Sequence, residues 1–203
     1  IAVGMPAPFL AIHLLWINLI TDSLPAIALG MQSKDPDVMK QAPRNPNESL
    51  FAHGGIRLIA WYGTFLTIGS ILSYLAPAWL QGHYAYSDIK SFYEIPANWA
   101  QAQTMAFTAL ALMELLHMIG MSDTKHSFIH VFRDKNWMMA IAFFAGVALQ
   151  LLVIEVPGIS EVLSTTNLNG TEWGITMGIA FLPLLMHEVD VFIHFIKRKK
   201  QAR

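Results

Sequence analysis

The chain alternates between long apolar segments and shorter polar ones. Five apolar segments are each long enough to cross a hydrocarbon core about 30 Å thick at about 1.5 Å per helical residue. They cover residues 9–30, 56–79, 100–121, 137–156 and 173–196, and polar segments rich in turn-forming residues separate them. This pattern predicts an all-α membrane protein, a bundle of five transmembrane helices.

Composition and charge favour the same class. Hydrophobic residues make up 54% of the chain and charged residues 13%, whereas a soluble domain has about 25% charged residues. There is no cysteine, which excludes disulfides and thiolate metal sites. The net charge of −1 points to no particular partner. We therefore expect the chain to lie in a lipid bilayer and not to bind nucleic acid.

Lysine and arginine are unevenly divided between the two sides of the expected bundle. Twelve of the thirteen lie in or beside the first polar segment, the third polar segment or the C-terminal tail, and only Lys90 falls on the other side. Because cytoplasmic loops carry the excess of Lys and Arg, we expect a multi-pass membrane protein with a cytoplasmic C-terminus.

The first apolar segment contains an unusual group of polar residues. Asn18, Thr21 and Asp22 share one face at α-helical spacing, and a carboxylate at that depth costs about 2.5–3.5 kcal/mol unless it meets protein, water or an ion. Pro25 has no N–H for the carbonyl at position 21. The pattern predicts a helix broken near Asp22–Pro25 with a cation site at the break, or polar contacts that only join helices.

A second carboxylate, Glu114, lies in the third apolar segment. The first and third segments run in the same direction, and Asp22 and Glu114 both fall about 3–6 Å past the segment centres toward the cytoplasm. Carboxylate, amide and hydroxyl oxygens suit a hard cation such as calcium, which takes about six to eight of them. We expect carbonyls, water or other helices to supply the remainder. Taken alone, Glu114 could instead be a buried protonated carboxyl.

Other residues have expected structural roles. Gly63 with Thr67, and Gly174 with Gly178, place small residues four apart, as in close helix contacts. His117 is expected to pack between helices. Three residues of the last apolar segment are expected to pair with the basic tail or to contact the third segment; they are His187, Glu188 and Asp190.

The segment Leu-Leu-Trp-Ile-Asn-Leu-Ile-Thr-Asp-Ser-Leu-Pro-Ala at 14–26 resembles the sixth transmembrane helix of P-type cation ATPases, above all in the calcium-pumping branch. Residues 35–51 are similar to that family's loop between helices six and seven. The resemblance continues through Glu114 in helix eight to the basic end of helix ten. It implies that residues 1–203 are a single C-terminal transmembrane domain, helices six to ten of a plasma-membrane pump that exports calcium from the cytoplasm.

The resemblance also implies roles for particular residues. Asn18 would coordinate at one calcium site and Thr21 at another, Asp22 would bridge the two, and Glu114 would complete the site shared with Thr21. An asparagine at position 18, where sodium–potassium relatives have an acid, favours calcium as the transported ion. In the loop after helix six, a coupling segment would abut the phosphorylation domain; its charged residues are Asp35, Asp37 and Arg44.

The enzymatic part of such a pump is expected in other domains. The family's phosphorylated aspartate lies in an Asp-Lys-Thr-Gly context, which Asp134-Lys-Asn136 does not match, and no Gly-rich nucleotide loop is present. ATP and magnesium would act in cytoplasmic domains, and helices one to five would be partners in the same protein. The alternatives are a P-type pump for sodium or manganese, and a non-enzymatic membrane module such as half of a secondary cation carrier or an accessory subunit.

Overall fold

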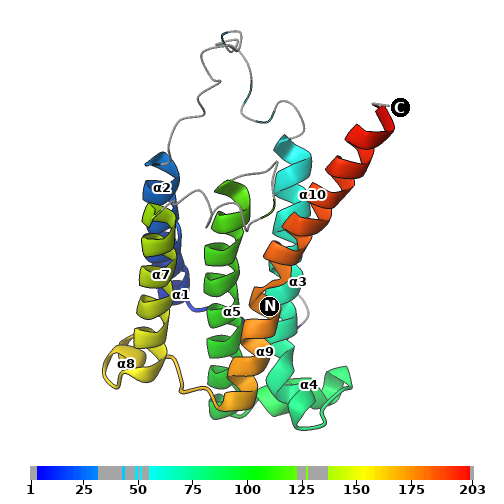
Figure 1. Cartoon of the computed structure of the whole chain (residues 1–203). Helices are drawn as coiled ribbons and strands as arrows, with labels where there is room; N and C mark the ends of the chain where they lie inside the picture. Colours follow the sequence, from blue (N-terminus) through cyan, green and yellow to red (C-terminus); the bar gives the residue numbers. More distant parts are fainter. Residues whose placement is uncertain are drawn as a thin grey trace.

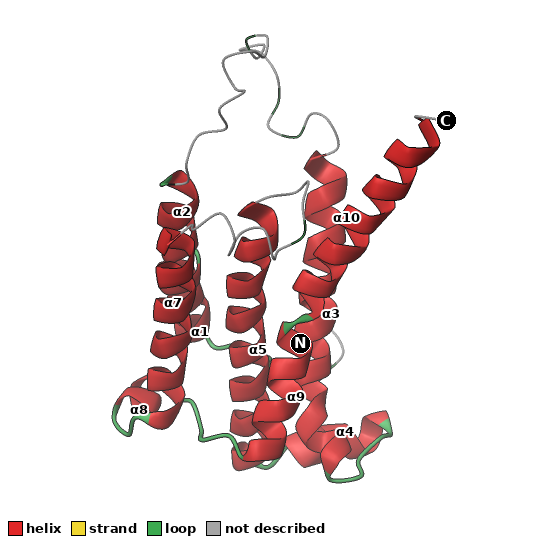
Figure 2. Ribbon diagram, in the orientation of Figure 1, coloured by secondary structure: helices red, strands yellow, loops and turns green. Residues whose placement is uncertain are grey.

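The computed structural model describes residues 4–31, 43, 49, 51, 55–122, 127 and 137–201. In these ranges the protein is helical and has no strand (Figures 1 and 2). Five helical stretches are long and apolar enough to span a membrane: Ala11–Gly30, Gly55–Leu80, Pro96–Ser122, Trp137–Glu155 and Gly170–Ile193. Each overlaps one of the predicted apolar segments, which confirms the predicted fold class.

The helix α5 (Pro96–Ser122) is the centre of the bundle. It packs against α3 (Gly55–Leu80), α7 (Trp137–Glu155), α9 (Gly170–Ala180) and α10 (Leu182–Gln201) (Figure 1). Of its most apolar window 78% is buried, against 24–33% for the other four stretches. One enclosed helix among four with exposed apolar faces is the distribution expected when lipid covers the outside of a bundle.

Close helix contacts occur at glycines other than those expected. A Cβ atom built at Gly146 of α7 would lie 2.6 Å from Leu115 Cδ2 of α5, and one at Gly69 of α3 would lie 2.6 Å from Met113 Sδ. By contrast, Gly63, Gly174 and Gly178 have open space around a Cβ atom, and the residue that pairs with Gly63, Thr67, is exposed. The expected small-residue pairs are therefore not contact points among the described residues, because spacing alone does not say which face meets a neighbour.

Two segments expected to be loops contain short helices at one end of the bundle. Helix α4 (Tyr86–Tyr93) buries Ile89, Phe92 and Tyr93 against α3 and α5. Helix α8 (Ile159–Leu163) follows α7 and lies at the same end of the bundle as α4 (Figure 1). We call this end the α4–α8 end. Neither helix was predicted, because eight and five residues are too few to give a clear hydrophobic period.

The last spanning stretch consists of two helices. Helix α9 ends at Ala180 and α10 begins at Leu182, because Pro183 has no N–H to donate to the carbonyl one turn earlier. Helix α10 continues to Gln201, and it leaves the bundle at an angle (Figure 1). The sequence predicted one helix over 173–196, so both the break and the extension are corrections.

Candidate cation site

The first spanning stretch is interrupted as predicted. Helix α1 (Ala11–Trp16) is followed by the π-helix η1 (Ile17–Thr21), by Asp22, and then by α2 (Ser23–Gly30). The Asp22 N–H donates to the carbonyl of Ile17 at 3.2 Å, a bond that spans five residues. The α-helical pattern resumes when Ala26 donates to the carbonyl of Asp22 at 3.0 Å. This confirms the break near Asp22–Pro25.

Local chemistry explains why the helix changes here. Pro25 is buried in the first turn of α2 and has no N–H, so the carbonyl of Thr21 loses its usual helical donor. Irregular backbone at membrane depth is tolerated where it is buried in protein or lines a wet cavity, and single π-turns inside helices are frequent at functional sites. The break therefore provides main-chain oxygen next to the polar side chains.

Two of the predicted ligands lie on the open side of this stretch. Asn18 and Asp22 are exposed, whereas Ile17 and Pro25 are buried. The geometry differs from the predicted one in one respect. Residues 17–21 are π-helical, so the α-helical spacing used to place Thr21 on the same face as Asn18 does not apply.

Glu114 is half-buried on α5. Helix α5 contacts both η1 and α2, so the helix that carries this second carboxylate packs directly against the break. The part of the chain that the structure describes holds no cluster of three or more His, Cys, Asp or Glu side chains. The ligand roles of Asp22 and Glu114 stay predictions. The predicted coupling residues Asp35, Asp37 and Arg44 lie outside the described residues.

Two polar residues of the last span have contacts that the structure defines, one expected and one not. His187 of α10 is 3% exposed and packs against Gly120 of α5, which confirms the expected contact with the third span. Asp190 accepts a hydrogen bond from the Tyr62 hydroxyl of α3 at 3.2 Å, a contact that was not expected. The ring of Tyr62 lies 4.4 Å from that of His117, so His117 does pack between helices.

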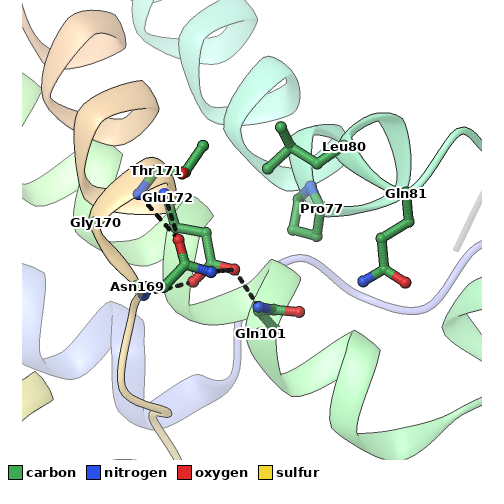
Figure 3. A pocket seen from close by; sticks show the side chains of 8 residues that line it. All are labelled: Pro77, Leu80, Gln81, Gln101, Asn169, Gly170, Thr171 and Glu172. Atoms are coloured by element: carbon green, nitrogen blue, oxygen red, sulfur yellow. Dashed lines mark hydrogen bonds between the residues drawn. The ribbon is translucent and has the colours of Figure 1, made fainter.

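A pocket of ≈ 590 Å³ lies at the α4–α8 end, between the ends of α3, α5 and α9 (Figure 3). Its one carboxylate, Glu172, is 4% exposed. It accepts from the Asn169 backbone N–H at 2.9 Å, from Asn169 Nδ2 at 2.6 Å, and from Gln101 Nε2. Asn169 in turn caps the start of α9. These hydrogen bonds satisfy the carboxylate internally, so we assign it the role of joining α9 to α5.

The structure also shows residues of the first span that sequence reasoning missed. His13 is fully buried on α1, and Trp16 Nε1 donates to Gln150 Oε1 of α7 at 3.3 Å. The sequence signal for these contacts was the presence of two polar residues, His13 and Gln150, inside apolar segments. The Leu163 carbonyl that His13 contacts is 150 residues away in the sequence, and Gln150 is 134 residues from Trp16, so these pairings could not be read from it.

A bundle of spans around one buried helix, with a carboxylate at a helix break, is the architecture of an integral membrane transport protein. The family model described as "Cation transporting ATPase, C-terminus" matches residues 6–193. The chain therefore belongs to the cation-transporting ATPases, and it corresponds to their C-terminal membrane domain.

Relatives agree with this assignment over nearly the whole chain. Calcium-transporting ATPase 1 of Bacillus cereus is 30% identical over 194 residues, which is 93% of this chain and 21% of the relative. Calcium-transporting ATPase 1 of Lactococcus lactis is 32% identical over 190 residues, 93% of this chain and 20% of the relative. The endoplasmic reticulum calcium ATPase srcA of Aspergillus fumigatus is 27% identical over 217 residues, 98% of this chain and 22% of the relative. The chain thus spans about a fifth of the length of these relatives, and the resemblance to the calcium-pump branch is confirmed.

Proposed function

We propose that this chain supplies one side of the ion-binding site of an ATP-driven calcium pump that exports calcium from the cytoplasm. The observation that carries the proposal is the broken first span, where Asn18 and Asp22 are exposed beside a π-helical segment. Relatives named as calcium-transporting ATPases support calcium as the transported ion. ATP and magnesium would act in cytoplasmic domains of the full-length protein.

The proposed ligands are all oxygen donors. Asp22 would bridge two ions, Asn18 would add its amide oxygen to one, and Thr21 and Glu114 would serve the other. Calcium takes about six to eight oxygens at 2.3–2.6 Å, so these four residues need help from main-chain carbonyls, water and helices one to five of the full-length protein. The exposure of Asn18 and Asp22 supports this arrangement, because it leaves them open to such neighbours.

The break also suggests how the site would be coupled to ATP. Helix α2 lies between the proposed ligands and the segment that holds the coupling residues Asp35, Asp37 and Arg44. A movement of that segment, driven by the phosphorylation domain, would displace α2. The backbone of η1, which carries the proposed ligands, would then change conformation. In this proposal the α4–α8 end lies on the outer side of the plasma membrane, and the C-terminus lies on the cytoplasmic side.

The test uses the full-length protein and the variant Asp22→Asn. This change keeps the volume of the side chain and removes its charge. We expect it to abolish calcium-stimulated phosphorylation from ATP, while phosphorylation from inorganic phosphate, which requires ion-free sites, survives. Asp88→Asn is the matched control, because Asp88 is an exposed carboxylate on α4 and its loss should change neither reaction.

Three results would contradict the proposal. Calcium-activated turnover in the Asp22→Asn variant would show that Asp22 does not bridge two calcium ions. Activation of the wild-type protein by sodium or manganese, and not by calcium, would assign a different cation. If the full-length protein makes no phosphorylated form from ATP under any ion condition, it is not an ATP-driven pump, and the alternative of a non-enzymatic membrane module replaces the proposal.

A further inference from the structure

A fully buried histidine anchors the first half of the broken span. His13 of α1 is 0% exposed, and its ring stacks on that of Phe107 of α5, with centroids 4.6 Å apart and an angle of 19° between the planes. A polar ring inside a membrane span is costly unless its nitrogens are hydrogen-bonded. Its partners therefore show what holds it in place.

Both ring nitrogens have partners. Nδ1 accepts the backbone N–H of Leu10 at 3.3 Å, just before α1 begins. Because a neutral imidazole has one donor and one acceptor, Nε2 carries the hydrogen and donates it to the carbonyl of Leu163 at 2.8 Å. Leu163 is the last residue of α8, where helix carbonyls lack donors of their own. One ring thus joins the start of α1 to the end of α8.

Trp16 makes a second connection one turn further along α1. Its indole N–H donates to Gln150 of α7 at 3.3 Å, and the Gln150 amide reaches Thr108 Oγ1 of α5 at 3.5 Å. These bonds are longer than the one from His13 to Leu163, so we take His13 as the stronger anchor. Together His13 and Trp16 define the face of α1 that docks on α5, α7 and α8.

Hydropathy alone does not set this orientation. Helix α1 has only six residues of its own before the π-helical segment begins. Its exposed residues include Leu14 and Leu15, and lipid tails are as apolar as leucine, so burial in a bilayer does not distinguish one face from another. Directional hydrogen bonds fix the rotation about the helix axis, and the packing of Ile12 and Trp16 against the apolar cluster that contains Phe107 and Leu163 adds to them.

We propose that His13, assisted by Trp16, is a positioning residue for the cation site. By fixing the rotation of α1, it directs Asn18 toward the open side on which Asp22 also lies. The inference rests on the proposed function, because it takes Asn18 and Asp22 as ligands. It adds a role for a side chain that touches no ion and lies at the α4–α8 end of the span.

The experiment measures calcium dependence in the full-length protein. We expect His13→Ala to raise the half-saturating calcium concentration for phosphorylation from ATP by about tenfold, equivalent to about 1.4 kcal/mol, and to leave turnover at saturating calcium within about twofold. His13→Gln should return the half-saturating concentration to within about threefold of wild type, since its amide N–H can donate to the Leu163 carbonyl.

Thr165→Val is the matched control. Thr165 lies two residues after Leu163, and the change removes a buried 2.8 Å hydrogen bond to the carbonyl of Val153, which is on α7 and not on α1. We expect no change in half-saturating calcium. The amount of phosphorylated protein formed from inorganic phosphate measures how much folded pump each preparation contains. A loss of folded protein is therefore not mistaken for a loss of calcium affinity.

Three outcomes would overturn the inference. The first is an unchanged half-saturating calcium concentration in His13→Ala. The second is an equal shift in Thr165→Val, and the third is failure of His13→Gln to recover affinity. If His13→Ala gives no folded pump, Trp16→Phe replaces it and should raise half-saturating calcium by about threefold; no shift there also overturns the inference. A wild-type protein without calcium-stimulated phosphorylation would instead contradict the proposed function.

Discussion

The contact between α5 and α7 at Gly146 allows a sharp test of how the bundle is packed. A Cβ atom at Gly146 would lie 2.6 Å from Leu115 Cδ2 and 2.9 Å from Leu115 Cδ1, whereas carbon atoms in contact prefer about 3.5–4.0 Å. Leu115 is 0% exposed, so it has little room to retreat. Gly146→Ala should therefore destabilise the membrane domain.

The magnitude follows from two opposing effects. Overpacking a tight interior costs about 1–3 kcal/mol, while replacing glycine by alanine inside a helix returns about 1 kcal/mol. We expect a net loss of about 1 kcal/mol in the free energy of unfolding. Gly174→Ala is the control, because a Cβ atom there meets nothing within 4 Å. It should be neutral or should stabilise by up to about 1 kcal/mol.

The assay is the unfolding of the purified full-length protein in detergent, followed by tryptophan fluorescence. A double variant sharpens it. Leu115→Ala alone should destabilise by about 2–5 kcal/mol through the cavity it leaves. Adding Gly146→Ala to that background should raise stability, since the new methyl group fills part of the cavity. The reasoning would be refuted if Gly174→Ala lost as much stability as Gly146→Ala. It would also be refuted if Gly146→Ala lowered the stability of the Leu115→Ala variant as it lowers that of the wild type.

Three further predictions concern the ion site. Glu114→Gln should weaken calcium-stimulated phosphorylation from ATP less than Asp22→Asn does, because it touches one of two proposed sites; equal loss in radiolabelled phosphoenzyme assays would contradict this. Asp35→Ala combined with Asp37→Ala should slow phosphorylation from ATP while equilibrium calcium binding, measured with radioactive calcium, persists; wild-type rates would make the segment a passive connector. The isolated chain in detergent should show no calcium affinity tighter than about millimolar by calorimetry, because four side chains are too few ligands for calcium. A micromolar site would mean that the chain supplies more of the calcium ligands than these four side chains.

Much of the architecture could be predicted from local features of the chain. Apolar length gives the number of spans and their approximate ends, because a helix must be apolar over the thickness of the hydrocarbon core to cross it. The break in the first span was also predictable, since Pro25 lacks an N–H whatever surrounds it. Asp22 and Glu114 were visible as candidates because a carboxylate is costly in a membrane segment. Their roles as ligands stay predictions.

Tertiary structure decided which faces of these helices meet. Gly146 and Gly69 lie at close contacts while Gly63 and Gly174 do not, although all four lie in apolar helices, because contact depends on how each helix is rotated. The same holds for His13, whose partner Leu163 is 150 residues away. Within a bilayer, apolar faces are equivalent toward lipid, so hydropathy determines that a segment spans but not how it turns. That rotation, which leaves Asn18 and Asp22 on the open side, follows only from the packed bundle.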